Sequence, residues 1–254
     1  MKSARTARIP TSGTVGVITS KEELRIARSI QAPPDFFELR LDRLLPLDES
    51  DFGQLKSPLI ITARHPAEGG AANLTQTERR DLLSKFLPHA ALIDIELRSL
   101  SALYEIWQEA GRKKIGRICS FHNFNRTPEL GRLQKQRQRA VNAGADIFKI
   151  VTRADAMDDL ITLLRVLRLQ SNAARLCVMA TGKFGAISRL LFPECGSVLI
   201  YAPLNRAFHD GQTRRNESGR IWFWVPSQAL GPQVQRNTLH HQRDPVWRIR
   251  PYLR

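Results

Sequence analysis

The chain has 254 residues, of which 42% are hydrophobic and 25% are charged, a composition typical of a soluble globular protein. Its three cysteines form no CxxC pair, which excludes a disulfide scaffold and a zinc ribbon. No run approaches the ~20 apolar residues of a membrane-spanning helix, and the basic amino end lacks the apolar core of a secretory signal. We therefore expect a cytoplasmic protein that does not bind membranes.

The formal net charge of +15 arises mainly from arginine, which supplies thirty of the 39 basic residues. These residues are scattered, and they match no zinc-finger, helix-turn-helix or RNA-binding motif. A nucleic-acid interface would gather them on one face. We favour a solvated arginine-rich surface and expect no nucleic-acid partner.

Short apolar and β-branched runs recur through the first 204 residues and predict eight strands. The predicted strands span residues 14–19, 36–41, 58–64, 91–97, 117–122, 146–151, 175–181 and 197–202. Helix-like segments lie between them, with apolar stripes in residues 74–87 and 158–170. Thr75 and Glu78 have the spacing of a capping box, and Thr127 is predicted to cap a helix with Pro128 in its first turn.

This alternation predicts an α/β fold, the (β/α)₈ TIM barrel, which commonly needs ~250 residues. The competing fold is a doubly wound open sheet. It would carry a glycine-rich phosphate-binding turn after its first strand, whereas Thr19, Ser20 and Lys21 follow here. We predict a catalytic barrel over residues 1–212.

The pattern ends after residue 205. Residues 213–254 contain four prolines and three of the four tryptophans, with no amphipathic stripe. We expect the eighth helix to be absent or replaced by an irregular basic tail. A frameshift near residues 205–213 would explain this composition. So would a natural extension whose Trp222, Phe223 and Trp224 fill the gap between the first and seventh helices.

Charged side chains stand near the predicted strand ends, where a buried strand would carry aliphatic ones. They are Glu38, Arg40, Asp42, Arg64, Glu68, Asp94, Glu96, His122 and Lys149. The carboxyl ends of barrel strands form the active sites of TIM-barrel enzymes. Nine such residues on five consecutive strands favour a functional cavity over separate structural ion pairs.

Lys149 lies between bulky apolar neighbours within the sixth predicted strand. A desolvated lysine can lose its proton and attack a carbonyl to form a Schiff base, which arginine cannot do. A lysine paired with a carboxylate, or extended to the barrel rim, accounts for this strand equally well. His122 is suited to proton transfer at physiological pH. The other histidines lack metal-ligand spacing and no GxSxG elbow is present, so we expect neither a metal site nor a serine nucleophile.

Several segments occur in an order known from one enzyme family: ELRLD (38–42), TARHPAEGG (62–70), IDIEL (93–97), SFHNF with Thr127-Pro128 (120–128), ADIFKIV (145–151), TGKFGAISR (181–189), GSVLIYAPL (196–204) and Gly211-Gln212. With them the chain resembles the type I 3-dehydroquinate dehydratases, the Schiff-base enzymes of the shikimate pathway, over about residues 14–212. The resemblance implies a TIM barrel, commonly a homodimer, without metal or organic cofactor. It also implies an anionic small-molecule substrate, 3-dehydroquinate, which is dehydrated to 3-dehydroshikimate.

The resemblance assigns roles by position. Lys149 would form the imine with the substrate ketone, and His122 would be the general acid and base. Glu68 and Asp94 would support the histidine and the pocket. The substrate-binding positions would be Glu38, Arg40, Arg64, Arg189 for the carboxylate, and Gln212 in the loop after the eighth strand.

That loop departs from the family pattern. Phe208 replaces a small hydroxyl residue and Asp210 replaces a proline. A phenyl ring cannot donate the hydroxyl's hydrogen bond, which leaves a ligand-binding pseudoenzyme as an alternative. Another Schiff-base lyase acting on an anionic keto substrate is a second alternative, because imine chemistry is general.

Overall fold

The computed structural model describes residues 10–71, 74–169, 174–204, 214–215 and 221–222. The barrel strands are β1 (Gly13–Ile18), β2 (Phe36–Arg40), β3 (Leu59–Thr62), β4 (Ala90–Glu96), β5 (Gly116–Asn123), β6 (Ile147–Arg153), β7 (Arg175–Thr181) and β8 (Leu199–Pro203). Each predicted strand is present, with small shifts at its ends.

Helices follow the strands along the chain. The α-helices are α1 (Lys21–Ser29), α2 (Leu41–Leu44), α3 (Glu49–Phe52), α4 (Gln76–Phe86), α5 (Tyr104–Arg112), α6 (Leu130–Asn142), α7 (Met157–Arg168) and α8 (Gly185–Glu194). The short 3₁₀ turns are η1 (Pro66–Glu68), η2 (Leu87–His89), η3 (Leu97–Ser99) and η4 (Gly182–Phe184). None of the described helices is long and apolar enough to cross a membrane.

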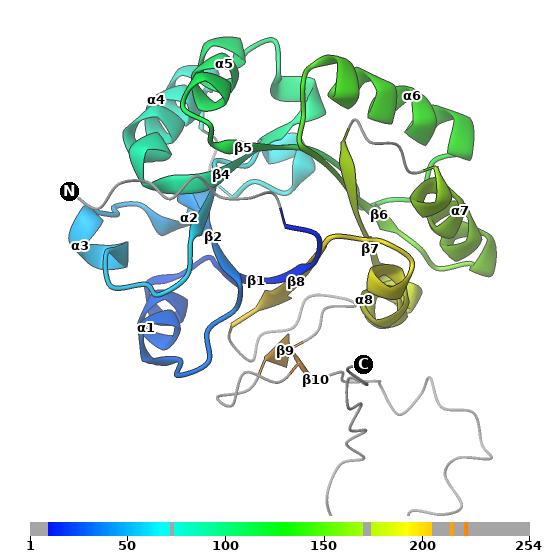
Figure 1. The fold of residues 1–254 in the computed structure, drawn as a ribbon, viewed down its shortest axis with the longest axis horizontal. Helices are drawn as coiled ribbons and strands as arrows, with labels where there is room; N and C mark the ends of the chain where they lie inside the picture. The colour runs from blue at the N-terminus through cyan, green and yellow to red at the C-terminus, as the bar shows by residue number, and fades with distance from the viewer. Residues whose placement is uncertain (1–9, 72–73, 170–173, 205–213, 216–220, 223–254) are drawn as a thin grey trace, which may run out of the picture.

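Within the described ranges, eight parallel strands form one sheet in the order β7-β6-β5-β4-β3-β2-β1-β8. The sheet curls into a ring with the helices around its outside (Figure 1). This arrangement is the predicted (β/α)₈ barrel. It rules out the doubly wound alternative, because β8 pairs back onto β1 and the helices cover a single face of the sheet.

Side-chain hydroxyls and a guanidinium help to join β7 to β8, where the ring closes. Val198 donates a backbone hydrogen bond to Leu176 O at 2.9 Å. The Ser197 hydroxyl accepts from Val178 N at 2.9 Å and donates to Val178 O at 3.2 Å. Nearer the carboxyl ends, Arg189 of α8 donates to Ala180 O at 2.8 Å and to the carbonyl of Tyr201 at 3.4 Å. The segment around α8 therefore satisfies backbone groups at the closure.

Apolar side chains pack on both faces of the strands. Inside the ring lies a buried cluster that includes Ile60, Leu92 and Ile118. Residues that alternate with these, such as Ile61 and Ile93, pack outward against the helices in a larger cluster. Because successive side chains on a strand point to opposite faces, the apolar runs fill both layers.

Local signals in the sequence are partly confirmed. The capping box at α4 is present, since Thr75 N donates to Glu78 Oε2 at 2.7 Å and Glu78 N to Thr75 Oγ1 at 3.2 Å. The cap at Thr127 is wrong: α6 begins at Leu130, and the Thr127 hydroxyl instead donates to Arg153 O at 2.7 Å. That bond ties the loop before α6 to the end of β6.

Asp42 alternates with Glu38 and Arg40 in the sequence, which predicts all three on one face of the second strand, and this placement is also wrong. Strand β2 ends at Arg40, and Asp42 lies in the short helix α2. The Arg40 guanidinium donates hydrogen bonds to both Asp42 carboxylate oxygens at 2.9 and 2.8 Å, and Asp42 accepts another from Arg64 N at 3.2 Å. These bonds draw the chain into a turn immediately after the strand.

The predicted tail falls largely outside the described residues. Four tail residues are described, and they pair antiparallel as β9 (Arg214–Arg215) and β10 (Ile221–Trp222). This short ladder is more regular than the irregular chain expected there. The predictions of a missing helix after β8, of a frameshift, and of a plug formed by Trp222, Phe223 and Trp224 concern residues or side chains that the structure does not describe.

The closure of the barrel should depend on Ser197. We expect Ser197→Ala to lower the free energy of unfolding by about 1–3 kcal/mol, because a buried N–H at Val178 loses its acceptor. Ser50→Ala, at an exposed position, is the control and should change it by less than about 0.5 kcal/mol. Urea denaturation of both variants measures the difference. An equal effect of the two would contradict the role of Ser197.

Candidate active site

Polar side chains replace aliphatic ones inside the barrel one layer above the apolar cluster. The strand register sets Thr62 of β3 beside Asp94 of β4, and Ser120 of β5 beside Lys149 of β6. All four residues are buried. They point inward because each stands two residues after an inward apolar residue of its own strand. The sequence therefore places a polar layer toward the carboxyl-terminal mouth of the barrel.

Arg64 and Asp94 form a two-pronged ion pair in this layer. The Arg64 guanidinium donates to the two Asp94 oxygens at 3.2 and 2.9 Å, and to Ser120 Oγ at 2.6 Å. Its other carboxylate neighbours are Glu96 at 3.3 Å and Glu38 at 3.8 Å. Buried bidentate arginine–carboxylate pairs are geometrically specific, so Asp94 is held in one orientation.

Lys149 extends into the same cluster. Its Nζ donates to Asp94 Oδ2 at 3.0 Å and lies 3.7 Å from Glu38 Oε1. The side chain is only 4% exposed. On another side, Nζ lies 3.7 Å from the centroid of the Tyr201 ring. The amine is therefore enclosed by carboxylates and by an aromatic face.

His122 stands two residues beyond Ser120 on β5, which places it closer to the mouth than Lys149. Its Nδ1 lies 2.9 Å from Glu68 Oε2, and its backbone N–H donates to the same oxygen at 3.0 Å. Glu68 ends the short turn η1, which follows β3. Because Glu68 engages Nδ1, the other ring nitrogen, Nε2, is the one directed away from this pair.

The buried charges shift the proton affinities of these groups in opposite directions. Burial alone would raise the pKa of Asp94, but the cations of Arg64 and Lys149 hold it well below its usual range. Burial lowers the pKa of His122 well below its usual value, and the same two cations add to the effect. Burial, with help from the charge of Glu96, raises the pKa of Glu68 to about 7. At neutral pH Asp94 is a carboxylate and His122 a neutral imidazole, able to accept a proton.

The structure brings Glu38, Arg64, Glu68, Asp94, His122 and Lys149 together. Arg40 lies at the rim, where Asp42 and the carbonyl of Gly69 hold its guanidinium. Arg189 is buried at the β7–β8 closure, and burial lowers its pKa to about 10. Gln212, Phe208 and Asp210 lie outside the described residues.

Four residues that the prediction did not include belong to this network. Thr62 donates to Glu38 at 2.7 Å, and Ser120 donates to Asp94 at 2.5 Å. Tyr201 packs on the amine of Lys149. Arg79 of α4 donates to Glu96 Oε2 at 2.5 Å from outside the barrel. Strand alternation would have found the first three, but no local signal marks an arginine on an outer helix.

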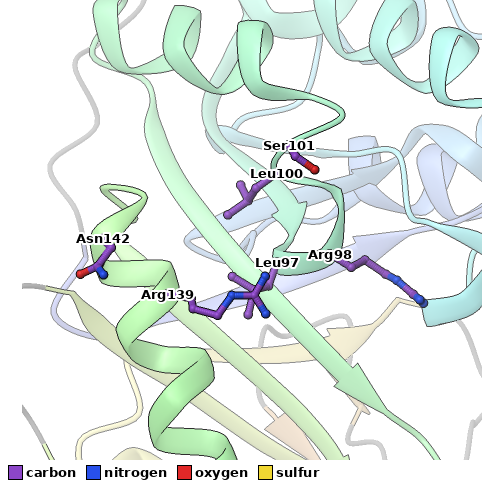
Figure 2. Close-up of a pocket in the computed structure, with 6 residues that line it drawn as sticks. All are labelled: Leu97, Arg98, Leu100, Ser101, Arg139 and Asn142. Atoms are coloured by element: carbon purple, nitrogen blue, oxygen red, sulfur yellow. The ribbon is translucent and has the colours of Figure 1, made fainter.

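A separate hollow lies away from these residues. A cavity of about 330 Å³ is lined by the η3 segment with the residues after it and by the second half of α6: Leu97, Arg98, Leu100, Ser101, Arg139 and Asn142. Figure 2 shows Arg139 projecting from α6 toward Leu97 of η3. The sequence-predicted site residues are not part of its lining. In the portion of the chain that is described, no cluster of three His, Cys, Asp or Glu side chains is arranged to hold a metal ion.

Comparison with known proteins connects this geometry to a family. Residues 14–221 match the family model described as type I 3-dehydroquinase. The chain belongs to the type I 3-dehydroquinase family. The match includes every described residue of the buried cluster and extends past β8 as far as Ile221.

Individual relatives agree with this assignment. A 3-dehydroquinate dehydratase of Thermodesulfovibrio yellowstonii is 32% identical over 202 residues, covering 80% of this chain and 87% of the relative. One of Thermococcus gammatolerans is 32% identical over 199 residues, covering 78% and 91%. The crystal structure of the Aquifex aeolicus 3-dehydroquinate dehydratase superposes with a TM-score of 0.67 at 26% identity, covering 78% of this chain and 92% of that one.

The raised pKa of Glu68 predicts a pH-dependent stability difference. A carboxyl whose pKa is raised on folding favours the native state at low pH, and this contribution is lost as pH rises from about 4.5 through about 7. Glu68→Gln does not titrate. Between pH 4.5 and 8 the parent should therefore lose stability relative to this variant, by up to about 3 kcal/mol. Denaturant titrations at several pH values measure it, with exposed Glu22→Gln as control. A pH-independent difference would contradict the raised pKa.

Proposed function

We propose that this protein converts 3-dehydroquinate to 3-dehydroshikimate through a covalent imine on Lys149, with His122 as the general acid and base. The observation that carries this proposal is the buried Lys149 amine, 3.0 Å from Asp94, below a histidine whose pKa is lowered by burial. Membership of the type I 3-dehydroquinase family supplies the substrate. The geometry supports lysine and histidine as the reacting pair.

Imine formation fits the charge balance around Lys149. The neutral amine attacks the ketone carbon, the carbinolamine loses water, and a protonated imine results. Overall, an ammonium and a ketone become an iminium and water, so the positive charge stays on the same nitrogen. Asp94 and Glu38, at 3.0 and 3.7 Å from that nitrogen, can therefore stabilise the iminium as they stabilise the ammonium. No buried carboxylate loses its counter-charge during the step.

His122 then removes a proton from the carbon next to the iminium, whose electron pair moves toward nitrogen and forms an enamine. The imidazolium donates that proton to the leaving hydroxyl as the electrons return and expel it as water. A second water hydrolyses the product imine and restores the Lys149 ammonium. Glu68 holds the imidazole through Nδ1 at 2.9 Å, which leaves Nε2 for both transfers.

Arg64, Arg189 and Arg40 would contribute in different ways to the binding of an anionic substrate. Arg64 is already shared by Asp94 and Glu96, so its main effect is to fix Asp94 beside the reacting nitrogen. Arg189, beside the carbonyls of Ala180 and Tyr201, would hold the substrate carboxylate, with Arg40 adding positive charge at the rim. Gln212 would close over the substrate from the loop after β8.

Trapping of the imine tests the nucleophile. Sodium borohydride added with 3-dehydroquinate should reduce the iminium to a stable secondary amine, because hydride adds to the C=N carbon. Peptide mass spectrometry should locate this adduct on Lys149. Lys149→Ala should give no adduct and no turnover, whereas exposed Lys183→Ala should behave like the parent. An unmodified Lys149 in protein that turns over substrate would refute the mechanism.

Substitution of Lys149 and substitution of His122 should block different steps of the proposed reaction. His122→Ala should still form the imine but process it about 10²–10⁴-fold more slowly, so that the adduct accumulates. Intact-protein mass spectrometry after borohydride treatment measures this accumulation, and absorbance of the enone product measures turnover. If folded His122→Ala binds the substrate but forms no adduct, the assigned roles are wrong.

Phe208 allows a direct test of the pseudoenzyme alternative. The dehydration assay should be run on the full chain beside Phe208→Ser, which restores a hydroxyl in the loop. Turnover by the parent supports the proposed function. If the parent binds the ligand without forming the enone and Phe208→Ser forms it, the chain is an impaired member of the family.

A further inference from the structure

The aromatic ring of Tyr201, on the last barrel strand, lies against Lys149 Nζ. It stands on β8, is 6% exposed, and its ring centroid is 3.7 Å from Lys149 Nζ. Cation–π attraction extends to about 6 Å and is strongest where the cation is desolvated. In the described part of the chain, the other cation–ring contacts are longer: 5.3 Å at Trp107, 5.5 Å at Phe86 and 5.6 Å at Phe184. The closest cation–ring contact therefore falls on the lysine proposed to react.

The carboxylates around Lys149 are shared with Arg64, whereas among the described residues Lys149 alone is recorded as a cation over the Tyr201 ring. Asp94 also pairs with Arg64 at 2.9 Å, and Glu38 lies 3.8 Å from that guanidinium. Asp94 accepts a further hydrogen bond from Ser120, and Glu38 accepts one from Thr62. The face of the Tyr201 ring offers negative electrostatic potential to the lysine nitrogen independently of these bonds.

We propose that Tyr201 is a catalytic residue whose ring face stabilises the cationic iminium formed at Lys149. The inference rests on the proposed function, because the iminium is an intermediate of that reaction. The attacking amine and the carbinolamine are neutral at Nζ, whereas the iminium carries a positive charge there. The ring therefore favours the iminium over the neutral carbinolamine that precedes it.

The hydroxyl of Tyr201 is separable from its ring. Its Oη is buried and has no hydrogen-bond partner among the described residues. The ring itself belongs to the inner apolar cluster, with Val15, Met179 and Leu199. Tyr201→Phe therefore removes the hydroxyl and keeps the aromatic face, whereas Tyr201→Leu removes the face.

Borohydride trapping with 3-dehydroquinate distinguishes the two variants. We expect the ratio of reduced imine to carbinolamine adduct, which mass spectrometry separates, to fall about 2- to 30-fold in Tyr201→Leu and to stay within about twofold of the parent in Tyr201→Phe. Phenylalanines carrying one to three fluorines at this position should lower the ratio stepwise, because fluorine weakens the potential of the ring face with little change of shape. An equal loss in the Phe and Leu variants would overturn the proposal, and so would a ratio that ignores fluorination.

A double-mutant cycle measured without substrate tests the contact between the Tyr201 ring and Lys149 independently of the proposed function. Tyr201→Leu and Lys149→Met, made singly and together, should show a coupling of about 2- to 30-fold in the unfolding equilibrium constant. Exposed Tyr104→Leu, combined with Lys149→Met, is the control and should show none. Absence of an adduct in the parent overturns the proposed function and the iminium role together. An adduct without coupling at Tyr201 overturns the role of the ring alone.

Discussion

The guanidinium of Arg64 is the centre of a buried charge cluster on which the site depends. Charges removed from water are costly unless they are paired, and three of the buried carboxylates surround this guanidinium: Glu38, Asp94 and Glu96. Arg64 contacts each of them, while Lys149 and Arg79 supply the other positive charges. The named groups balance, with a formal charge of zero. Lys149 therefore belongs to an electrostatic unit in which each member offsets the desolvation of another.

The barrel makes this unit possible by stacking layers along its axis. Inward positions near the amino ends of the strands are apolar, and the next inward positions on β2 to β6 carry the polar groups. His122 lies one inward position further on β5 and is tied to Glu68 rather than to the balanced cluster. Burial lowers the pKa of His122, and the nearby cations of Arg64 and Lys149 add to the effect. The proposed nucleophile Lys149 and the proposed proton acceptor His122 therefore lie in different layers of the barrel.

Closure of the ring connects the outer helices to the chemistry. Strand β8 reaches β7 through Ser197 and through Arg189 of α8, and this junction carries Tyr201 into the interior. Lys149 stands on β6 and Tyr201 on β8, which are not neighbours in the sheet. Their 3.7 Å contact therefore depends on the closure of the ring. On the opposite side of the cluster, Arg79 ties α4 to Glu96. The groups in and around the cluster are thus positioned by contacts between separate elements of the chain.

The sequence by itself determined the alternation of strands and helices, the inward faces of the strands, and the candidacy of Lys149 and His122, because each depends on periodicity within one element. Only the tertiary structure decided which charges meet. Arg79 donates a hydrogen bond to Glu96 from an outer helix, and Tyr201 packs on Lys149. Thr127 donates to the end of strand β6 instead of capping its own helix. Local periodicity specifies the direction of a side chain, whereas its partner depends on strand register and ring closure, which long-range packing sets.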